Sequence, residues 1–401
     1  MNIVLLNTYS HGGAGVACRR LLEGLRATQP DISAQLITAA EAGSRWPFYA
    51  ERLSFLPHER DRSVRFAFSP ANFGKDLSRH PAVRQADLLH LHWVNQGLLS
   101  LRGIRQLAEL GKPMVWTLHD TWAFTGGCHI FTDCDRFRQQ CGVCPYLRRP
   151  GPHDLSHQVW LKKQRFFPKN IHFVTCSHWL RDVARSSSLL QGFPITSIPN
   201  PIDTALFKPA EAADRAALRA EMGIAPGAHV LLFVAMNLRD AHKGFRFLPE
   251  ALQHLRRQRP DLAVEVVVLG KSEPESLSAF PYPVHALGLV QGAERLSRLY
   301  GAADVFVTPS LADNLPNTVM ESLACGTPVV GFRTGGIPEM VGHLQEGYIA
   351  RQGDSAALAA GIAWVLCQAG PSLRENARLK VSSTYANEVV ARQYADLYRQ
   401  M

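Results

Sequence analysis

The chain has 401 residues, 46% of them hydrophobic, and a formal net charge of +9 at neutral pH. This length exceeds what one hydrophobic core usually supports, so it favours two domains. No stretch approaches the roughly 20 apolar residues of a membrane-spanning helix. The run Asn2–Asn7 lacks a basic leader, so we expect a first strand there rather than a signal peptide. The sequence therefore predicts a cytoplasmic protein with reduced cysteines, which could work at the inner face of the plasma membrane.

Positive charge is concentrated in the first half of the chain. Residues 1–205 contain 24 Lys and Arg against 15 Asp and Glu, whereas residues 206–401 contain 19 of each. Such a half would be attracted to an anionic partner such as a membrane leaflet or a phosphorylated lipid, although each arginine alone is more simply a solvated surface residue. No nucleic-acid partner is expected, because no recognition module accompanies the charge.

Short apolar runs alternate with helical patterns throughout, which predicts an α/β protein with two doubly wound, Rossmann-like parallel sheets. The expected strands are 3–6, 33–38, 88–92, 114–118, 172–176, 196–199, 230–235, 263–269, 284–287, 305–308, 328–332 and 346–349. The segment 200–209 carries two prolines and no helical period, so it is the expected linker. The predicted domains are residues 1–203 and 204–384, with a helix in 385–401 that crosses back onto the first domain.

The first strand leads into a glycine-rich turn, residues 11–17, ahead of a predicted helix. Gly13 and its neighbours would allow a ligand to approach the backbone closely at the helix N-terminus. The same glycines could form a dinucleotide fingerprint with Glu41 as the ribose-binding acid, but Cys18 stands at the third glycine position, so we do not favour a dehydrogenase.

Three further segments of the first half carry residue types with functional potential. His90 and His92 alternate along one strand, so they share a face and are expected to pack against the sheet. Four cysteines within seventeen residues could hold a structural zinc, or could simply be packed thiols: Cys128, Cys134, Cys141 and Cys144. Residues 160–169 interleave aromatics with four cations, so they could lie against anionic lipid or equally contribute core contacts.

The segment 309–330 is the most informative part of the second half. It follows the buried strand 305–308 and opens a helix near Pro316, whose fixed φ suits the first turn. A helix N-terminus at the carboxyl end of a parallel strand is an anion site, so the amides of residues 317–319 are expected to face a diphosphate. Asp313 precedes this helix and Glu321 lies one turn into it, so one acid could reach a sugar and the other a ribose.

These residues resemble the E-x7-E signature of glycosyltransferase family 4, the retaining enzymes with the GT-B double-Rossmann fold. Residues 326–330 and 334–339 resemble the continuation of that signature, and 200–209 resembles the element between the two domains. Asp313 stands where the family usually has Glu, and Arg239 lies four residues before Lys243 rather than five. The pattern 88–95 with 116–122 is similar to the branch tied to exopolysaccharide and colanic-acid-like assembly.

The resemblance implies a role for each matching residue. His119 and Asp313 would meet the donor sugar, and Lys243, with Arg239, would neutralise the diphosphate leaving group. Glu321 would bind the ribose. The set implied to bind the nucleotide sugar is Gly13, Arg239, Lys243, Asn314, Pro316, Asn317, Thr318 and Glu321. The resemblance implies no required cofactor and no catalytic metal.

The sequence therefore predicts a retaining glycosyltransferase that moves a sugar from a nucleoside-diphosphate sugar to a saccharide or polyprenyl-diphosphate-linked acceptor. A sugar-nucleotide epimerase or a phosphorylase would share the fold, and donor incubated without acceptor would distinguish an epimerase because it needs none. A catalytically silent assembly protein is the alternative from another class, which hydrolysis or transfer of the donor would exclude.

Overall fold

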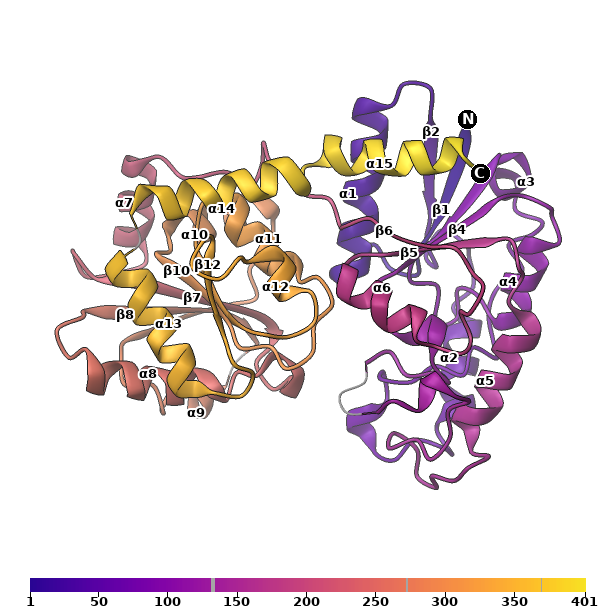
Figure 1. The fold of residues 1–401 in the computed structure, drawn as a ribbon, viewed down its shortest axis with the longest axis horizontal. Coiled ribbons are helices and arrows are strands. Elements are labelled where there is room, and N and C mark those ends of the chain that lie inside the picture. Colours follow the sequence, from indigo (N-terminus) through magenta and orange to yellow (C-terminus); the bar gives the residue numbers. More distant parts are fainter. Residues whose placement is uncertain (131–133, 272, 369) are drawn as a thin grey trace. The chain divides into compact units, whose positions relative to one another are not determined.

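The computed structural model describes residues 1–401 except 131–133, 272 and 369. The chain divides into two compact units (Figure 1). Unit 1 comprises Met1–Pro201 together with Asn387–Met401, and unit 2 comprises Ile202–Ala386. These bounds lie close to the domain limits expected from the sequence, and the C-terminal helix belongs to unit 1.

Unit 1 is built around a six-stranded parallel sheet in the order β2-β1-β3-β4-β5-β6. Its strands are buried apolar runs such as Met114–Leu118, as parallel sheets covered on both faces require. The strands are β1 Asn2–Leu6, β2 Ser33–Ile37, β3 Leu88–Leu91, β4 Met114–Leu118, β5 Ile171–Thr175 and β6 Ile195–Ser197. The helices are α1 Gly12–Thr28, α2 Trp46–Phe55, α3 Pro81–Gln85, α4 Leu101–Ala108, α5 Leu155–Phe166, α6 His178–Arg185 and α15 Asn387–Arg399, with short 3₁₀ turns at Arg62–Val64, Trp122–Phe124 and Arg136–Arg138.

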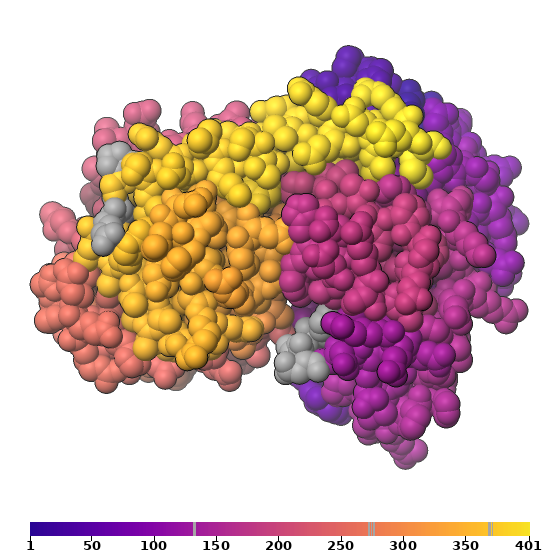
Figure 2. Space-filling model, viewed as in Figure 1, coloured from indigo at the N-terminus to yellow at the C-terminus, as the bar shows by residue number. Residues whose placement is uncertain are grey.

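The last helix, α15, completes unit 1 by packing beside α1 (Figure 2). Gly24 of α1 permits a close approach, because a Cβ there would lie 3.0 Å from the carbonyl oxygen of Asn387. Two buried tyrosines of α15 reach polar groups of the sheet: the Tyr394 hydroxyl lies 2.8 Å from Thr117 Oγ1, and the Tyr398 hydroxyl lies 2.7 Å from His90 Nδ1. The expected sheet-packing role of His90 is thereby confirmed.

Unit 2 holds a second six-stranded parallel sheet in the order β12-β11-β10-β7-β8-β9. Its strands are β7 His229–Asn237, β8 Val264–Lys271, β9 Val284–Gly288, β10 Val305–Thr308, β11 Val329–Phe332 and β12 Gly347–Ala350. Its helices are α7 Ala212–Glu221, α8 Phe247–Gln258, α9 Pro274–Leu277, α10 Ala293–Ala302, α11 Asn317–Ala324, α12 Ile337–Met340, α13 Ser355–Gln368 and α14 Pro371–Thr384, with the 3₁₀ turn η4 at Ala241–Lys243. The predicted doubly wound fold and all twelve predicted strands are confirmed.

The strand orders mark where each unit should bind a ligand. In open parallel sheets, ligands bind beyond the carboxyl ends of the strands, at the point where the strand order reverses. In unit 1 that point lies between β1 and β3, and in unit 2 it lies between β7 and β10. The loops that leave these four strands are therefore the places to look for a site.

Burial decides between the two interpretations of one segment of unit 1. The aromatic and basic segment 160–169 does not form a lipid-facing surface, because Trp160, Lys163 and Phe167 are buried in the core. Its helix, α5, turns these residues inward, which is the alternative that the sequence left open.

Among the described residues no single helix is long and apolar enough to cross a bilayer, although one sharply bent pair, Ser355–Cys367 with Ser372–Thr384, passes by length and composition alone.

Candidate nucleotide-sugar and acceptor sites

An ion pair stands at the strand-order reversal of unit 2. Lys243, in the loop after β7, donates a hydrogen bond of 2.7 Å from Nζ to Oδ2 of Asp313, in the loop after β10. The Asp313 side chain is 15% exposed and that of Lys243 is 35% exposed, so the pair remains open to a ligand. The negative charge of Asp313 raises the pKa of Lys243, so the ammonium stays protonated at neutral pH. Two residues seventy positions apart thus form one charged site.

Two glycines allow these loops to approach each other. Gly244 has a φ of +63°, and a Cβ there would lie 1.9 Å from the carbonyl oxygen of Pro309. Gly335, after β11, has a φ of +52°, and a Cβ there would lie 1.6 Å from the carbonyl oxygen of Asp313. Both positions need the left-handed region and the empty space that only glycine provides. The three loops beyond β7, β10 and β11 are therefore packed backbone to backbone around Asp313.

Helix α11 begins at this site with its N-terminus toward the loop that carries Asp313. Pro316 caps the helix in an extended conformation with ψ of 122°, so the helix starts one residue later than predicted. The amide of Val319 hydrogen-bonds the Pro316 carbonyl at 3.1 Å, so the prediction that this amide faces a ligand is wrong. The amides of Asn317 and Thr318 precede those of Val319 and Met320, which both donate to the Pro316 carbonyl.

Glu321 lies one turn further along α11 and is largely buried. The hydroxyl of Tyr300, from α10, donates a hydrogen bond of 3.2 Å to its Oε2. Tyr300 is itself fully buried, so it holds the carboxylate in one orientation. The backbone of Asn314 joins the same loop cluster, because its carbonyl accepts the Gly336 amide at 2.8 Å.

Arg239 is not brought to this pair. Its guanidinium forms an ion pair with Glu273, and its side chain is mostly exposed. It lines a surface hollow of about 610 Å³ on the β7–α8 loop, together with Asp240 and Gly244, but Lys243, Asp313 and Glu321 do not line that hollow. We give more weight to the charged pair than to the hollow, because the pair lies at the strand-order reversal.

In unit 1, His119 follows β4 and is engaged at both ring nitrogens. Its Nε2 lies 2.9 Å from Nδ1 of His92, and its Nδ1 lies 3.6 Å from Sγ of Cys176. Burial lowers the pKa of His119 to about 4, so the ring is neutral at physiological pH. Its predicted contact with the donor sugar remains a prediction.

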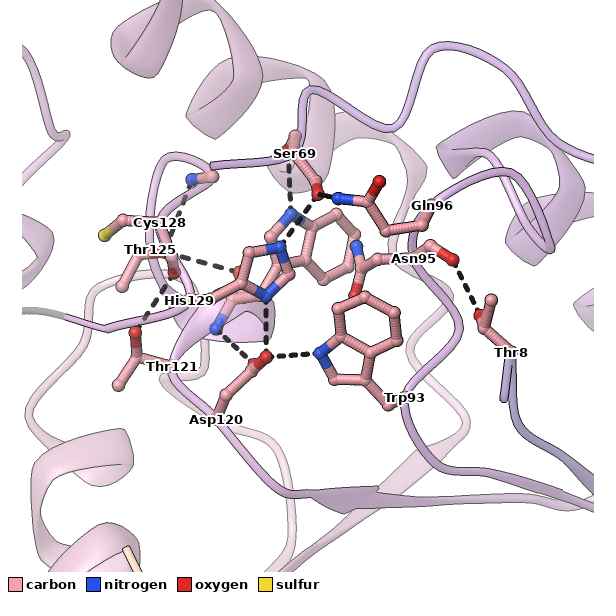
Figure 3. A network of polar contacts seen from close by, with 12 residues as sticks. Thr8, Ser69, Trp93, Asn95, Gln96, Asp120, Thr121, Thr125, Cys128 and His129 are labelled. Carbon is pink, nitrogen blue, oxygen red and sulfur yellow. Dashed lines mark hydrogen bonds and ion pairs between the residues drawn. The ribbon is translucent and has the colours of Figure 1, made fainter. Parts of the chain in front are cut away.

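A polar network that the sequence did not single out is centred on Asp120, the residue after His119 (Figure 3). The carboxylate of Asp120 lies 2.6 Å from Nδ1 of His129 and accepts a 2.6 Å bond from the indole of Trp93. Nε2 of His129 lies 2.8 Å from Oγ of Ser69. Burial alone would raise the pKa of Asp120, but His129 and these hydrogen bonds together lower it, so the carboxylate stays ionised.

This Ser–His–Asp arrangement resembles that of a hydrolase, but its burial favours a positioning role. Ser69 is 1% exposed, so its hydroxyl is inaccessible to a substrate. Its oxygen also receives a bond of 3.2 Å from the side-chain amide of Gln96. The chain of donors runs from Gln96 through Ser69 and His129 to Asp120, which also holds the Trp93 ring.

The ring of Trp93 belongs to a partly exposed aromatic row at the β1/β3 reversal. Tyr9, after β1, stacks on Trp93 with ring centroids 5.8 Å apart, and His11 lies 5.2 Å beyond Tyr9. Within the described residues, Nδ2 of Asn95 and Oε1 of Gln96 are buried without a hydrogen-bond partner. Such groups are costly unless a ligand satisfies them. Aromatic faces beside unpaired polar groups suit a saccharide, which offers both C–H and hydroxyl groups.

The sequence did contain a signal for this second site. Trp93 and Asp120 directly follow two strands that the sequence predicts, β3 and β4. Ser69 and His129 could not be found in this way, because they come from irregular segments that only the folded chain brings together.

Buried Lys163 supports the turn that leads to His129, and we expect it to make stability depend on pH. Its ammonium donates to the carbonyls of Trp122 and Thr125, the latter at 3.0 Å, and lies 3.6 Å from the Trp122 ring centroid. Burial lowers the pKa of Lys163 to about 7. The unfolded chain then binds more protons than the folded chain above pH 7, so the free energy of unfolding should rise by roughly 1 kcal/mol per pH unit between about pH 7 and 8.

Urea unfolding followed by tryptophan fluorescence would test this, because six of the seven tryptophans lie in unit 1. Lys163→Met should flatten the rise, whereas Lys162→Met, at the adjacent and less buried position, should retain it. An equal slope in wild type and Lys163→Met would contradict the assignment.

The sequence also points to Gly13, Glu41 and the cysteines as candidate functional residues. Gly13 lies in the first turn of α1, and Glu41 bonds the amide of Thr38 at 2.8 Å, closing its own turn. All eight cysteines are free, and burial raises the pKa of Cys128 to about 11 and that of Cys141 to about 12. In the described part of the chain, no three His, Cys, Asp or Glu side chains are arranged to hold a common metal, and a structural zinc at these cysteines stays a prediction.

With both sites described, comparison with known proteins identifies the class. The two sheets and their order define a GT-B glycosyltransferase fold, and HepE of Anabaena, solved with UDP, aligns over 100% of both chains with a TM-score of 0.66 at 17% identity. Sequence models place a Glycosyltransferase Family 4 domain at residues 11–206 and a Glycosyl transferases group 1 domain at residues 228–368. The chain therefore belongs to the glycosyltransferases that combine these two domains.

Curated relatives agree with this family. A D-inositol 3-phosphate glycosyltransferase of Pseudarthrobacter chlorophenolicus is 31% identical over 69% of this chain and 61% of its own length. The putative colanic acid biosynthesis glycosyl transferase WcaC of Escherichia coli is 28% identical over 65% of this chain and 62% of its own length. The chain thus spans less than two thirds of the length of these curated relatives.

Proposed function

We propose that the chain is a retaining glycosyltransferase that moves a hexosyl group from a nucleoside-diphosphate sugar to a saccharide or lipid-linked saccharide in cell-surface polysaccharide biosynthesis. The observation that carries this proposal is the Lys243–Asp313 pair at the start of α11. Lys243 and the α11 amides would bind the diphosphate, Asp313 the sugar hydroxyls and Glu321 the ribose. The HepE complexes with UDP and with UDP-glucose, and the colanic-acid relative, support this choice.

In the proposed transfer, no protein nucleophile is needed. The bond between the sugar and the leaving phosphate breaks as the acceptor oxygen attacks from the same face. The proton of the acceptor hydroxyl passes to the departing phosphate oxygen, and the Lys243 ammonium offsets the charge that develops on the diphosphate. The neutral ring of His119 would contribute to holding the donor sugar.

We further propose that the acceptor saccharide binds in unit 1, on the Tyr9–Trp93 row. Nδ2 of Asn95 and Oε1 of Gln96, which are buried without a partner among the described residues, would hydrogen-bond its hydroxyls once acceptor binding exposes them. A polyprenyl-diphosphate-linked acceptor would place the protein at the inner face of the plasma membrane.

A thermal-shift panel of UDP, GDP, ADP and dTDP sugars would test the donor assignment, followed by mass analysis with and without saccharide acceptors. We expect one nucleotide to raise the melting temperature and the sugar to appear on an acceptor. Failure of every nucleotide to stabilise the protein would contradict the proposal. Isomerisation of the donor without acceptor would indicate an epimerase instead.

Trp93→Ala should weaken acceptor binding without weakening donor binding. Loss of the indole removes about 1–2 kcal/mol of stacking, so the acceptor KM should rise roughly tenfold. Steady-state transfer with the acceptor found in the panel would measure it, and Trp93→Phe, which keeps a ring but loses the bond to Asp120, should retain most of the affinity. An unchanged acceptor KM in Trp93→Ala would place the saccharide elsewhere.

A further inference from the structure

Exposed apolar side chains are concentrated on α2 and the loop that follows it. Trp46, Leu53 and Phe66 are 67%, 61% and 62% exposed. Tyr49 and Leu56 are exposed as well, and positions 46, 49, 53 and 56 follow the spacing of one helical face. Soluble surfaces rarely gather apolar groups in this way unless the surface contacts a partner.

The opposite side of α2 is firmly packed, so the exposed face is not a sign of a loose helix. Phe55 is fully buried and stacks on Phe68 with ring centroids 5.0 Å apart. The buried carboxylate of Glu51 accepts the backbone amides of Ala71, at 2.6 Å, and Phe73, at 3.0 Å. The apolar face is therefore exposed to solvent on a helix whose opposite face is packed against unit 1.

Arginines surround this face, whereas the nearby acids are neutralised. Arg45 and Arg62 are exposed, and the guanidinium of Arg45 lies 5.8 Å from the Tyr49 ring centroid. Arg52 lies 4.8 Å from the Phe66 ring centroid. Of the acids, Glu59 is buried and paired with Arg65 and Arg52, and Asp61 is paired with Arg60. The outward face thus combines aromatic and aliphatic groups with positive charge.

We propose that this α2 face binds the surface of a bilayer that contains anionic lipid. We define it as Trp46, Tyr49, Leu53, Leu56 and Phe66 with Arg45 and Arg62. Apolar groups would enter the boundary between headgroups and acyl chains, while the arginines remain among lipid phosphates. An anionic bilayer complements the positive charge of this face, whereas a second copy of the positively charged residues 1–205 would repel it.

The position of the face fits the proposed acceptor. The start of α2 rests on the loop that carries Gln96, because a Cβ on Gly97 would lie 2.4 Å from the backbone nitrogen of Phe48. Helix α2 therefore packs against the loop that follows Trp93 in the proposed saccharide site. This inference specifies the membrane contact within the proposed function. The vesicle binding that it predicts depends only on the α2 face and not on donor or acceptor binding.

Co-sedimentation with vesicles of phosphatidylglycerol and phosphatidylcholine, without nucleotide or acceptor, tests the proposal. Wild type should sediment with these vesicles and much less with pure phosphatidylcholine. Trp46→Ser/Leu53→Ser/Phe66→Ser should weaken the partition by roughly tenfold for each residue. Arg45→Gln/Arg62→Gln should weaken it by roughly fivefold per charge and reduce its salt dependence.

Leu289→Ser/Leu379→Ser is the matched control, because both leucines are exposed on unit 2. It should bind as wild type does, and circular dichroism should show every variant folded. Equal binding by the triple variant and wild type, or no wild-type binding, would overturn the proposal. Concentration-dependent dimers that only the triple variant abolishes, without vesicle binding, would assign the face to a second copy instead. Transfer to a water-soluble acceptor should survive the triple substitution, so failure here and failure of the proposed function are separable.

Discussion

Lys243→Ala is expected to lower the rate of sugar transfer by about two orders of magnitude. A preorganised charge on the leaving group typically contributes ~3 kcal/mol to transition-state stabilisation, and that amount corresponds to roughly a hundredfold in rate. Lys243 is partly exposed and its only described ion pair is with Asp313, so the variant should remain folded. Steady-state kinetics with saturating donor would measure the loss in kcat.

Lys271→Ala is the control for this prediction. Lys271 ends the neighbouring strand β8 and is exposed, so its removal changes net charge equally without touching the Asp313 loop. Wild-type turnover in Lys243→Ala, or an equal loss in Lys271→Ala, would show that the ion pair does not act on the leaving group.

Glu321→Gln is expected to raise the donor KM by ten- to a hundredfold while kcat changes little. A hydrogen bond to a charged group contributes about 1.5–3 kcal/mol, and glutamine retains the shape but not the charge. Wild type should bind a donor analogue that lacks a ribose hydroxyl more weakly than it binds the full donor. Glu321→Gln should bind the analogue and the full donor with equal affinity. That double comparison isolates the contact between Glu321 and the ribose.

Tyr300→Phe provides the intermediate case. It removes the 3.2 Å bond to Glu321 and keeps the buried ring, so the carboxylate is retained but less firmly oriented. Its donor KM should lie between those of wild type and Glu321→Gln. An unaltered donor KM in Glu321→Gln would contradict the ribose assignment.

The fold could be predicted from the sequence because buried parallel strands leave a strong local signal. Runs such as Met114–Leu118 and Val305–Thr308 have the same bounds in the sequence analysis and in the structure. The start of α11 was predicted one residue early, because a proline with its φ near −65° fits both the cap and the first helical turn. The sequence therefore located the donor loop but not the exact set of amides.

Side-chain placement could not be predicted where it depends on distant partners. Arg239 and Lys243 lie in the same loop, but only Lys243 pairs with Asp313. Arg239 pairs instead with Glu273, which the sequence pattern does not indicate. The Asp120–His129–Ser69 network joins residues separated by up to sixty positions, so no local sequence pattern predicts it. The interleaved aromatics and cations of residues 160–169 fit a lipid-facing surface and a buried helix face equally well, so the sequence alone leaves both interpretations open.

The central claim is that a diphosphate binds at the start of α11, between Lys243 and Glu321. The most direct measurement is a crystal structure with the nucleotide that the thermal-shift panel selects. The account predicts phosphate oxygens within hydrogen-bond distance of the Asn317 and Thr318 amides and of Lys243 Nζ, with the ribose at Glu321. A diphosphate bound in the hollow lined by Arg239, or anywhere else in unit 2, would contradict it.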